Sequence, residues 1–193
     1  IALPEKKKAG SNAGVIVKRG LLRFVHMLMN VYIQVFRGTP MIVQAVVIYY
    51  GAQYAGVFMD TTFAAVFIIS INTGAYMAEI IRGGIVSVDK GQFEAAHAIG
   101  MTHWQTMTTV VLPQAIRNIL PSVGNELIVN IKDSSVLNVI SVSELFFQAK
   151  SAAGTYYRYF EVYFIIAVIY LILTLTVSRI LRAVEKKMDG PAN

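Results

Sequence analysis

The sequence predicts an all-α protein that crosses a membrane several times. Only 15% of its 193 residues are charged, whereas a soluble domain carries roughly 25%, and the mean hydropathy is +0.57. Three long stretches contain no charged residue, namely residues 38–59, 61–78 and 162–178. Because about 20 apolar residues in a helix cross the hydrocarbon core of a bilayer, each stretch is a candidate span.

The first candidate span follows a more polar N-terminal part. The chain does not begin with methionine, and we expect an apolar segment to precede it. Residues 5–20 have the composition of a solvated loop, and residues 21–36 that of a helix at the membrane interface. Gly38 and Pro40 interrupt the backbone there, and Pro is compatible with the first turn of the following helix. We expect this span to end in a turn within residues 51–60.

The second candidate span covers Thr61 to Ile81. Ser70, Gly74 and Ala78 recur at every fourth position along it. Such a stripe of small residues lets another helix approach closely. We therefore expect this helix to pack inside the protein as well as to cross the membrane.

The third apolar region, residues 119–149, differs from the others because it contains charged residues. On a helix, Glu126, Asn130, Asp133 and Leu137 share one face, with Ser134 and Ser141 flanking it. Carboxylates at membrane depth usually face a bundle interior or a wet pathway. This face is therefore predicted to line a passage, with an ion pair between neighbouring helices as the alternative. Lys132 points about 100° away from Asp133 and does not belong to this face.

The fourth candidate span, Tyr163 to Val177, completes a topology that agrees with the charges. Positive segments next to spans stay in the cytoplasm. If the basic N-terminal part is cytoplasmic, then residues 82–118 and the basic C-terminal tail are cytoplasmic too. A basic patch can also bind nucleic acid, but beside hydrophobic spans we expect lipid and no nucleic acid.

Residues 92–115 contain no Asp, Glu, Lys or Arg after Glu94, yet their Thr, Gln and His suit neither a membrane span nor a buried core. Glu94, Ala95 and Ala96 predict a helix with a smooth face, which Gly100 turns and Pro113 stops. Bulky apolar residues flank this surface: Phe93, Ile99, Met101 and Trp104. The segment suits a partner's groove, although a simple connecting loop explains the composition equally well.

Several classes of function lack their motifs in this sequence. Without cysteine there is no thiolate metal site or cysteine nucleophile. His97 and His103 fall on different helix faces and His26 is remote, so no metal site is expected. No phosphate-binding loop motif occurs, so we expect the chain itself to bind no ATP. Neither a catalytic constellation nor an internal repeat stands out, which argues against a membrane enzyme and a secondary transporter.

Four motifs together resemble the membrane subunits of bacterial ABC importers. Glu94-Ala95-Ala96, Gly100 and Val110-Val111-Leu112-Pro113 resemble the family's EAA loop, with Val110 where the family usually has Ile. Residues 36–40 (FRGTP), 72–76 (NTGAY) and 131–135 (IKDSS) resemble the polar amino-acid branch. The resemblance extends from about residue 30 to 185.

This resemblance implies a type I importer permease of about five transmembrane helices, the first of which would precede residue 1. Residues 1–193 would form one permease domain in the bacterial cytoplasmic membrane, with 82–118 as the cytoplasmic coupling loop. The partners would be a second permease subunit, identical or homologous, an extracytoplasmic substrate-binding protein, and ATP-binding subunits that carry ATP and Mg²⁺. The coupling residues would be Glu94, Ala95, Ala96, Gly100, Leu112 and Pro113.

The resemblance also places a transmembrane amino-acid site near the Lys-Asp-Ser segment. Asp133 is expected to meet a cationic or polar part of the substrate, because a buried carboxylate forms charge-assisted hydrogen bonds with ammonium or guanidinium groups. The candidate neighbours are Asn130, Ser134, Glu126 and Asn72. The alternatives are an ABC permease for another small polar nutrient or, less readily, an ion-coupled secondary transporter.

Overall fold

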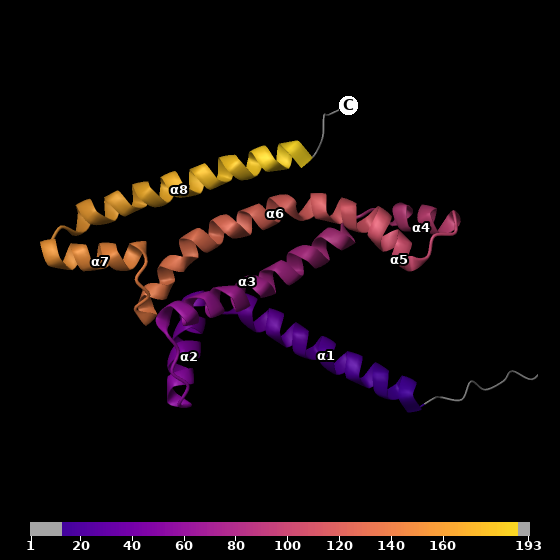
Figure 1. Cartoon of the computed structure of the whole chain (residues 1–193), viewed down its shortest axis with the longest axis horizontal. Helices are drawn as coiled ribbons and strands as arrows, with labels where there is room; N and C mark the ends of the chain where they lie inside the picture. Colours follow the sequence, from indigo (N-terminus) through magenta and orange to yellow (C-terminus); the bar gives the residue numbers. More distant parts are fainter. Residues whose placement is uncertain (1–12, 189–193) are drawn as a thin grey trace, which may run out of the picture.

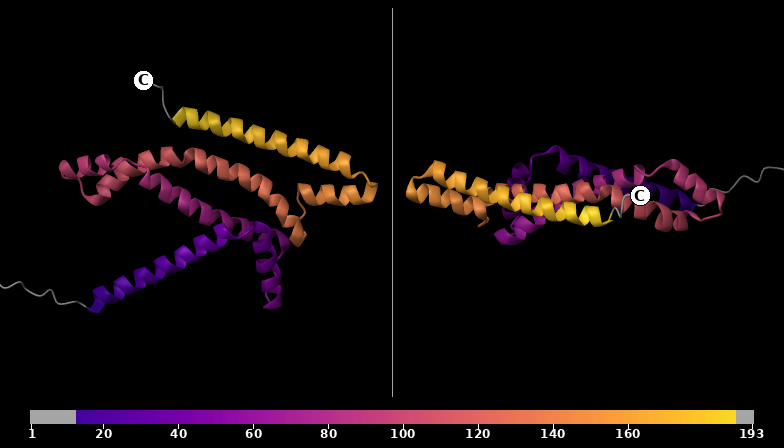
Figure 2. Two further views of the ribbon diagram at one scale, coloured as in Figure 1. Left: turned by 180° about the vertical axis from the view of Figure 1, so that it is seen from behind. Right: turned by 90° about the horizontal axis from the view of Figure 1, so that it is seen from above.

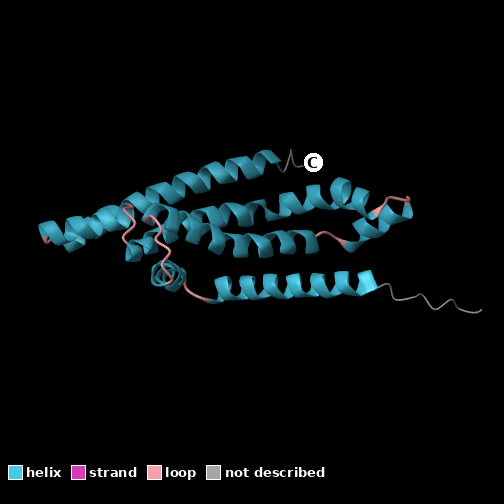
Figure 3. Ribbon diagram, turned by 60° about the horizontal axis from the view of Figure 1, so that its bottom comes forward, coloured by secondary structure: helices cyan, strands magenta, loops and turns pink. Residues whose placement is uncertain are grey.

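The computed structural model describes residues 13–188, and within this range every regular element is a helix, with no strand (Figures 1 and 3). The elements are α1 (Ala13–Gly38), α2 (Met41–Tyr54), α3 (Thr61–Val86), α4 (Lys90–Ala98), α5 (His103–Gln105), the π-helix η1 (Thr106–Val111), α6 (Leu112–Asp133), the 3₁₀-helix η2 (Ser134–Ile140), α7 (Leu145–Tyr156) and α8 (Tyr159–Met188). The predicted all-α class is confirmed.

The long helices form an elongated layer. Helix α6 lies between α3 and α8 and packs against both, while the last part of α1 contacts α3 and its beginning lies away from α3 (Figure 1). The view from above shows that this layer is thin compared with its length (Figure 2). The beginning of α1, the α4–α5 hairpin and the end of α8 point towards one end of the molecule, whereas α2 and α7 lie towards the other. Within the described residues, the basic residues at the start of α1 and at the end of α8 therefore lie towards the same end as the α4–α5 hairpin (Figure 1).

Two predicted spans are confirmed as long apolar helices. Within the described residues, α3 and α8 alone are each long and apolar enough to cross a membrane. Helix α8 exposes large apolar side chains along most of its length, which suits lipid or another protein surface. Gly74 of the predicted small-residue stripe is a contact point, because a Cβ there would lie 2.7 Å from the hydroxyl oxygen of Tyr32 on α1. Ser70, by contrast, is exposed.

The expectations for the first span are corrected. Residues 13–20, predicted as loop, and 21–36, predicted as an interfacial helix, form the single helix α1, while residues 1–12 lie outside the described part. Helix α2 has only 14 residues, too few to span alone. Helices α1 and α2 are long and apolar enough to cross a membrane only when they are taken together, and the bend between them is 115°.

The third apolar region is also corrected. Residues 119–149 do not form one span, because α6 begins at Leu112 and becomes the 3₁₀-helix η2 at Ser134. Ser141 then adopts a left-handed conformation with φ of 64°, and a separate helix starts at Leu145. Leu137 lies in an apolar core between α2, α3 and η2, formed by Ala45, Ala64, Ala65, Ile68, Leu137 and Ile140.

Candidate functional site

A cavity of about 380 Å³ lies where the break between α1 and α2 meets α3 and α6. It falls within the size range of small-ligand sites, about 300–1,000 Å³. It is lined by Thr39, Pro40, Met41, Asn72, Tyr76, Asn125, Glu126, Val129 and Asp133. Three of the five residues predicted to bind substrate therefore share this cavity: Asn72, Glu126 and Asp133.

The break itself is held by Gln44, a residue that the sequence did not single out. Pro40 has no N–H and restricts the preceding residue to extended backbone, so α1 ends here. The side-chain amide of Gln44 donates to the carbonyl oxygens of Phe36 (2.9 Å) and Thr39 (2.9 Å) and to Thr39 Oγ1 (2.8 Å). Gln44 is 6% exposed. In a membrane, such internal partners are needed wherever a helix is interrupted.

Asn72 ties α3 to this break. Its side-chain N–H groups donate to Gln44 Oε1 at 2.8 Å and to the carbonyl oxygen of Phe36 at 3.4 Å, and the residue is 7% exposed. One wall of the cavity is therefore fixed by a buried chain of hydrogen bonds. The position of Asn72 in the cavity agrees with its predicted role, and its contacts give it a structural role as well.

The opposite wall carries two carboxylates of α6, Glu126 and Asp133. They are seven residues apart, so they lie on one face two turns from each other. Glu126 is 9% exposed, and among residues 19–188 it has neither a hydrogen-bond donor nor an ion-pair partner. No buried side-chain oxygen in the described part of the chain lacks a partner, so the carboxylate oxygens of Glu126 are open to the cavity, and an unpaired charge at membrane depth is costly. This wall therefore favours a ligand that brings a positive charge.

Asn130 and Ser134 do not line the cavity. The hydroxyl of Thr73 donates to Asn130 Oδ1 at 3.1 Å, so Asn130 joins α6 to α3. The hydroxyl of Ser134 donates to the carbonyl oxygen of Ile131 at 2.9 Å, within the end of its own helix. Both residues lie beside the cavity wall, and their predicted contact with substrate is untested.

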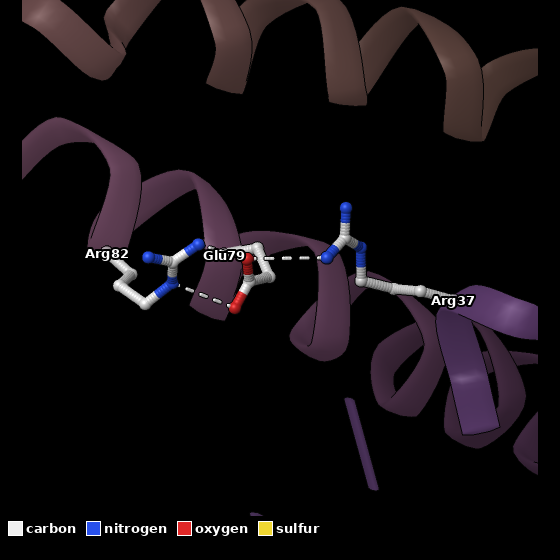
Figure 4. Close-up of polar contacts among 3 residues, drawn as sticks. All are labelled: Arg37, Glu79 and Arg82. Carbon is white, nitrogen blue, oxygen red and sulfur yellow. Dashed lines mark hydrogen bonds and ion pairs between the residues drawn. The ribbon is translucent and has the colours of Figure 1, made fainter. Parts of the chain in front are cut away.

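Arg37, Glu79 and Arg82 form a charged cluster on the side of α3 that faces α1 (Figure 4). Glu79 accepts from Arg82 Nη2 at 2.8 Å and lies 3.4 Å from Arg37 Nη1. The Arg37 guanidinium also lies 5.6 Å from the centre of the Tyr76 ring, which lines the cavity. Sequence patterns did not single out Glu79, although it is the first charged residue after an uncharged run and stands three positions before Arg82.

Four of the six predicted coupling residues lie at one end of the molecule, on α4 and in the turn that joins it to α5 (Figure 1). Glu94, Ala95 and Ala96 lie on α4, and Ala96 is buried. Gly100 follows the helix with φ of +83°, so it turns the chain as predicted. Beyond α4, Ile99 and Trp104 are 79% and 76% exposed, which leaves an apolar surface at the tip.

The prediction that Pro113 stops the helix is wrong. Leu112 and Pro113 begin α6, and the preceding residues form η1, so the chain is helical from His103 to Ile140. The proline ring clashes with the carbonyl four residues earlier in an α-helix, and the wider turns of a π-helix accommodate it. The side-chain amide of Gln114 donates to the carbonyl oxygen of Val110 at 2.8 Å, which satisfies this part of the backbone.

The hairpin is attached firmly to the long helices. Val88, Val111 and Ala115 form a second apolar core there, against which Phe93 of α4 packs together with Ile85 and Met107. Phe93 therefore joins α4 to η1 and α6 through this core. Within residues 13–188, no group of three or more His, Asp or Glu side chains could hold a metal ion.

Comparison with known proteins agrees with this geometry. Residues 10–190 match the family described as binding-protein-dependent transport system inner membrane component. The glutamine transport system permease protein GlnP of Escherichia coli (strain K12) is 44% identical over 160 residues, which cover 82% of this chain and 73% of GlnP. The arginine transport system permease protein ArtQ of Bacillus subtilis (strain 168) is 41% identical, with the same two coverages.

Two solved structures share the fold. A crystal structure of an amino acid ABC transporter with histidines matches with a TM-score of 0.82 and 46% identity, over 86% of this chain and 77% of that one. An inward-facing MetNI methionine ABC transporter matches with a TM-score of 0.66 and 21% identity, over 90% and 78%. The second match shows the fold alone. The type I permease fold implied by the four motifs is confirmed.

Proposed function

The chain belongs to the binding-protein-dependent transport system inner membrane component family, and from this premise we propose that it forms the translocation pathway of an ATP-driven importer of polar amino acids. The observation that carries this proposal is the cavity between the α1–α2 break and the carboxylates of α6. It offers hydrogen-bonding amides on one wall and negative charge on the other. The relatives of the chain include glutamine and arginine permeases, which supports polar amino acids as the substrate class.

The proposed complex contains two permease subunits, two ATP-binding subunits and an extracytoplasmic substrate-binding protein. ATP and Mg²⁺ belong to the ATP-binding subunits, because the chain carries no phosphate-loop motif. The α4–α5 hairpin and the C-terminus face the cytoplasm in this arrangement. The exposed Ile99 and Trp104 dock the hairpin in a groove of the ATP-binding subunit.

In the proposed mechanism, the hairpin acts as a lever. Closure of the ATP-binding subunits draws the two hairpins of the permease pair together, and the Phe93–Val111 packing passes this displacement to α6. Helix α6 carries Glu126 and Asp133, so the movement reaches the cavity directly. Hydrolysis of ATP then returns the pair to its inward-facing state.

Asp133, Glu126 and Asn72 contact the substrate in this proposal. Asp133 meets its cationic or polar part through charge-assisted hydrogen bonds. In this proposal Asn130 and Ser134 lie next to these residues and contact the substrate only when α6 moves. A different small polar nutrient remains the second candidate for the same cavity.

Uptake by the reconstituted complex tests this function. The permease is purified with its ATP-binding subunit, placed in proteoliposomes with ATP at the hairpin side, and offered a panel of radiolabelled amino acids together with the binding protein. We expect uptake and ATP hydrolysis to rise together for a small set of polar amino acids. Uptake driven by an ion gradient without ATP, or no response to any amino acid, would contradict the proposal.

A further inference from the structure

A separate cavity of about 370 Å³ is formed by the end of α6 together with η2, α7 and α8. It shares no lining residue with the cavity that contains Glu126 and Asp133, so the proposed transport path does not account for it. Its lining consists of one cation, three hydroxyl groups and three apolar side chains: Lys132, Ser135, Phe146, Tyr163, Ile166, Ala167 and Tyr170.

Three polar groups of this cavity are free to donate hydrogen bonds. Among residues 19–188, the ammonium group of Lys132 has no ion-pair partner, and the hydroxyl groups of Ser135 and Tyr163 form no hydrogen bond. Tyr170 differs, because its hydroxyl donates to Glu144 Oε2 at 3.3 Å. An ammonium group at membrane depth is costly unless an opposite charge reaches it. The cavity therefore favours an anion.

The carboxylate beside the cavity is already engaged by donors of the protein. Glu144 accepts from the backbone N–H groups of Phe146 at 2.7 Å and Phe147 at 2.6 Å, as well as from Tyr170. It thereby caps the start of α7. The cavity lining itself contains no carboxylate. A ligand with its own ammonium group would find no free carboxylate there, so a ligand with a net negative charge fits better than a zwitterion.

This cavity lies where α8 enters the apolar part of the membrane. The uncharged run of α8 begins at residue 162, directly after Glu161, so Tyr163 stands at the membrane–water boundary, a depth that tyrosine favours. A lysine side chain near this boundary extends its ammonium group towards the headgroups. Deeper in the membrane the cavity continues with Ile166 and Ala167. Helix α8 exposes further apolar side chains there: Phe164, Ile165, Val168 and Ile169.

We propose that this cavity binds an anionic phospholipid such as phosphatidylglycerol, with the headgroup phosphate on Lys132, Ser135 and Tyr163 and an acyl chain against Ile166 and Ala167. The lipid belongs to the membrane leaflet opposite to the α4–α5 hairpin, because α7 and the start of α8 lie at that end of the molecule (Figure 1). The inference concerns the membrane around the permease and does not depend on which nutrient the permease carries.

Substitutions at the cavity test the headgroup contact. Lys132→Ala removes the cation, whereas Lys132→Arg keeps one. Tyr163→Phe removes a hydroxyl group but keeps the ring, whose centre lies 5.7 Å from that of the Phe146 ring. Lys150→Ala is the matched control, because Lys150 is exposed on the neighbouring helix α7 and does not line the cavity.

Lipid binding is measured by native mass spectrometry of the purified permease with its ATP-binding subunit. The complex is titrated with phosphatidylglycerol or with phosphatidylcholine that carries the same acyl chains. The unaltered complex should bind phosphatidylglycerol at least about fivefold more tightly, the contribution of one lysine near an anionic membrane surface. Lys132→Ala should remove most of this preference and Tyr163→Phe should reduce it, whereas Lys132→Arg and Lys150→Ala should keep it.

Competition experiments distinguish the lipid from other anions and from the transported substrate. An equal concentration of inorganic phosphate should not displace the lipid, because phosphate lacks the acyl-chain contacts. Displacement by phosphate would assign the cavity to a free anion, and displacement by L-arginine or L-glutamine would assign it to the substrate. Either result overturns the inference. Equal affinity of the unaltered complex for both lipids, as expected if a second permease subunit covers the cavity, or an unchanged preference in Lys132→Ala, overturns it too.

A measurement on the unaltered protein decides the matter even if Lys132→Ala fails to fold. Phosphatidylglycerol with a photoreactive diazirine in its acyl chain should label residues 163–170 of α8, and labelling only elsewhere would contradict the inference. None of these experiments measures uptake, so the proposed function is tested separately by the transport assay.

Discussion

The chain interrupts its helices in two contrasting ways, at the α1–α2 break and at the α4 tip. At the break, buried side chains satisfy the backbone, with Gln44 bonded to the carbonyl groups of Phe36 and Thr39. At the tip, the backbone bonds to itself, since the N–H groups of Gly100 and Met101 donate to carbonyl groups of α4 at 3.0 Å each. Polar groups are therefore enclosed at the first site, and apolar side chains are exposed at the second.

The contrast follows from what surrounds each site. No water is available in a bilayer to replace lost helical hydrogen bonds, so an interruption there needs polar side chains and creates a polar cavity. Outside the bilayer, a turn needs only its own backbone bonds, and its side chains are free to meet a partner. The following predictions test this difference, beginning with the largest expected effect.

Replacing Gln44 by Leu should destabilise the fold most. The carbonyl groups of Phe36 and Thr39 lose a buried donor, and a buried group left unsatisfied costs about 1–3 kcal/mol. The free energy of unfolding, measured by titration with SDS in mixed micelles, should fall by about 3 kcal/mol. Gln92→Leu in the exposed part of α4 is the control and should have little effect. Equal losses in both variants would remove the distinction between break and tip.

Replacing Asp133 by Ala should reduce transport while leaving folding and binding of the ATP-binding subunit largely intact. One charge-assisted contact to the substrate is lost, so uptake at low substrate concentration should fall about tenfold or more. Lys132→Ala, on another face of the same helix, is the control and should retain most uptake. Unchanged uptake by the Asp133 variant would reject a substrate role for that carboxylate.

Replacing Gly100 by Leu should separate ATP hydrolysis from transport. A bulky side chain at φ of +83° is strained, by about 1–2 kcal/mol, so the tip is expected to change shape without disturbing the distant cavity. The number of ATP molecules hydrolysed per amino acid imported should rise about twofold or more, since this strain corresponds to at least a fivefold shift in equilibrium. Gly100→Asn, which tolerates positive φ, should keep the original ratio. Normal coupling in the Leu variant would rule out the tip as a rigid lever.

The smallest expected effect is at Asp60, in the exposed connection between α2 and α3. Its carboxylate accepts from the N–H groups of Phe63 and Thr62, which lowers its pKa. Because its pKa is lower in the folded state, the Asp60 carboxylate stabilises the folded protein at pH values above the unfolded-state pKa of about 3.9. This stability is lost as the pH falls through the folded-state pKa. The difference in Tm between the unaltered protein and Asp60→Ala should therefore shrink when thermal unfolding is repeated at pH 3 instead of pH 6. A constant difference would show that the carboxylate charge contributes nothing.

Hydropathy and helical periodicity predicted the parts of the molecule that depend on local sequence. The uncharged runs marked α3 and α8, and the seven-residue spacing of Glu126 and Asp133 placed both on one face. Ser134 does not line the cavity with them, because α6 becomes a 3₁₀-helix at that residue and the angle between successive side chains changes. Asn130 lies outside the cavity lining, where the hydroxyl of Thr73, on a different helix, donates to its side chain.

The helix break shows where local patterns stop being sufficient. Gly38 and Pro40 marked the interruption, but averaged hydropathy does not report a bend of 115° between two helices. Gln44 went unnoticed because its partners lie beyond a turn and on α3. Pro113 was misread for a similar reason, since its effect on the backbone was absorbed by the π-helix before it.

The sequence by itself determined the class of the protein, the membrane helices α3 and α8, the turn at Gly100 and the family motifs. Each of these depends on local composition or on a conformation that few residues adopt. The tertiary structure decided that the start of α2, Asn72 of α3 and the carboxylates of α6 surround one cavity. Residues 31 positions apart (Met41 and Asn72) to 92 positions apart (Met41 and Asp133) meet there only because packing of the helices and the buried hydrogen bonds of Gln44 set the angle between α1 and α2.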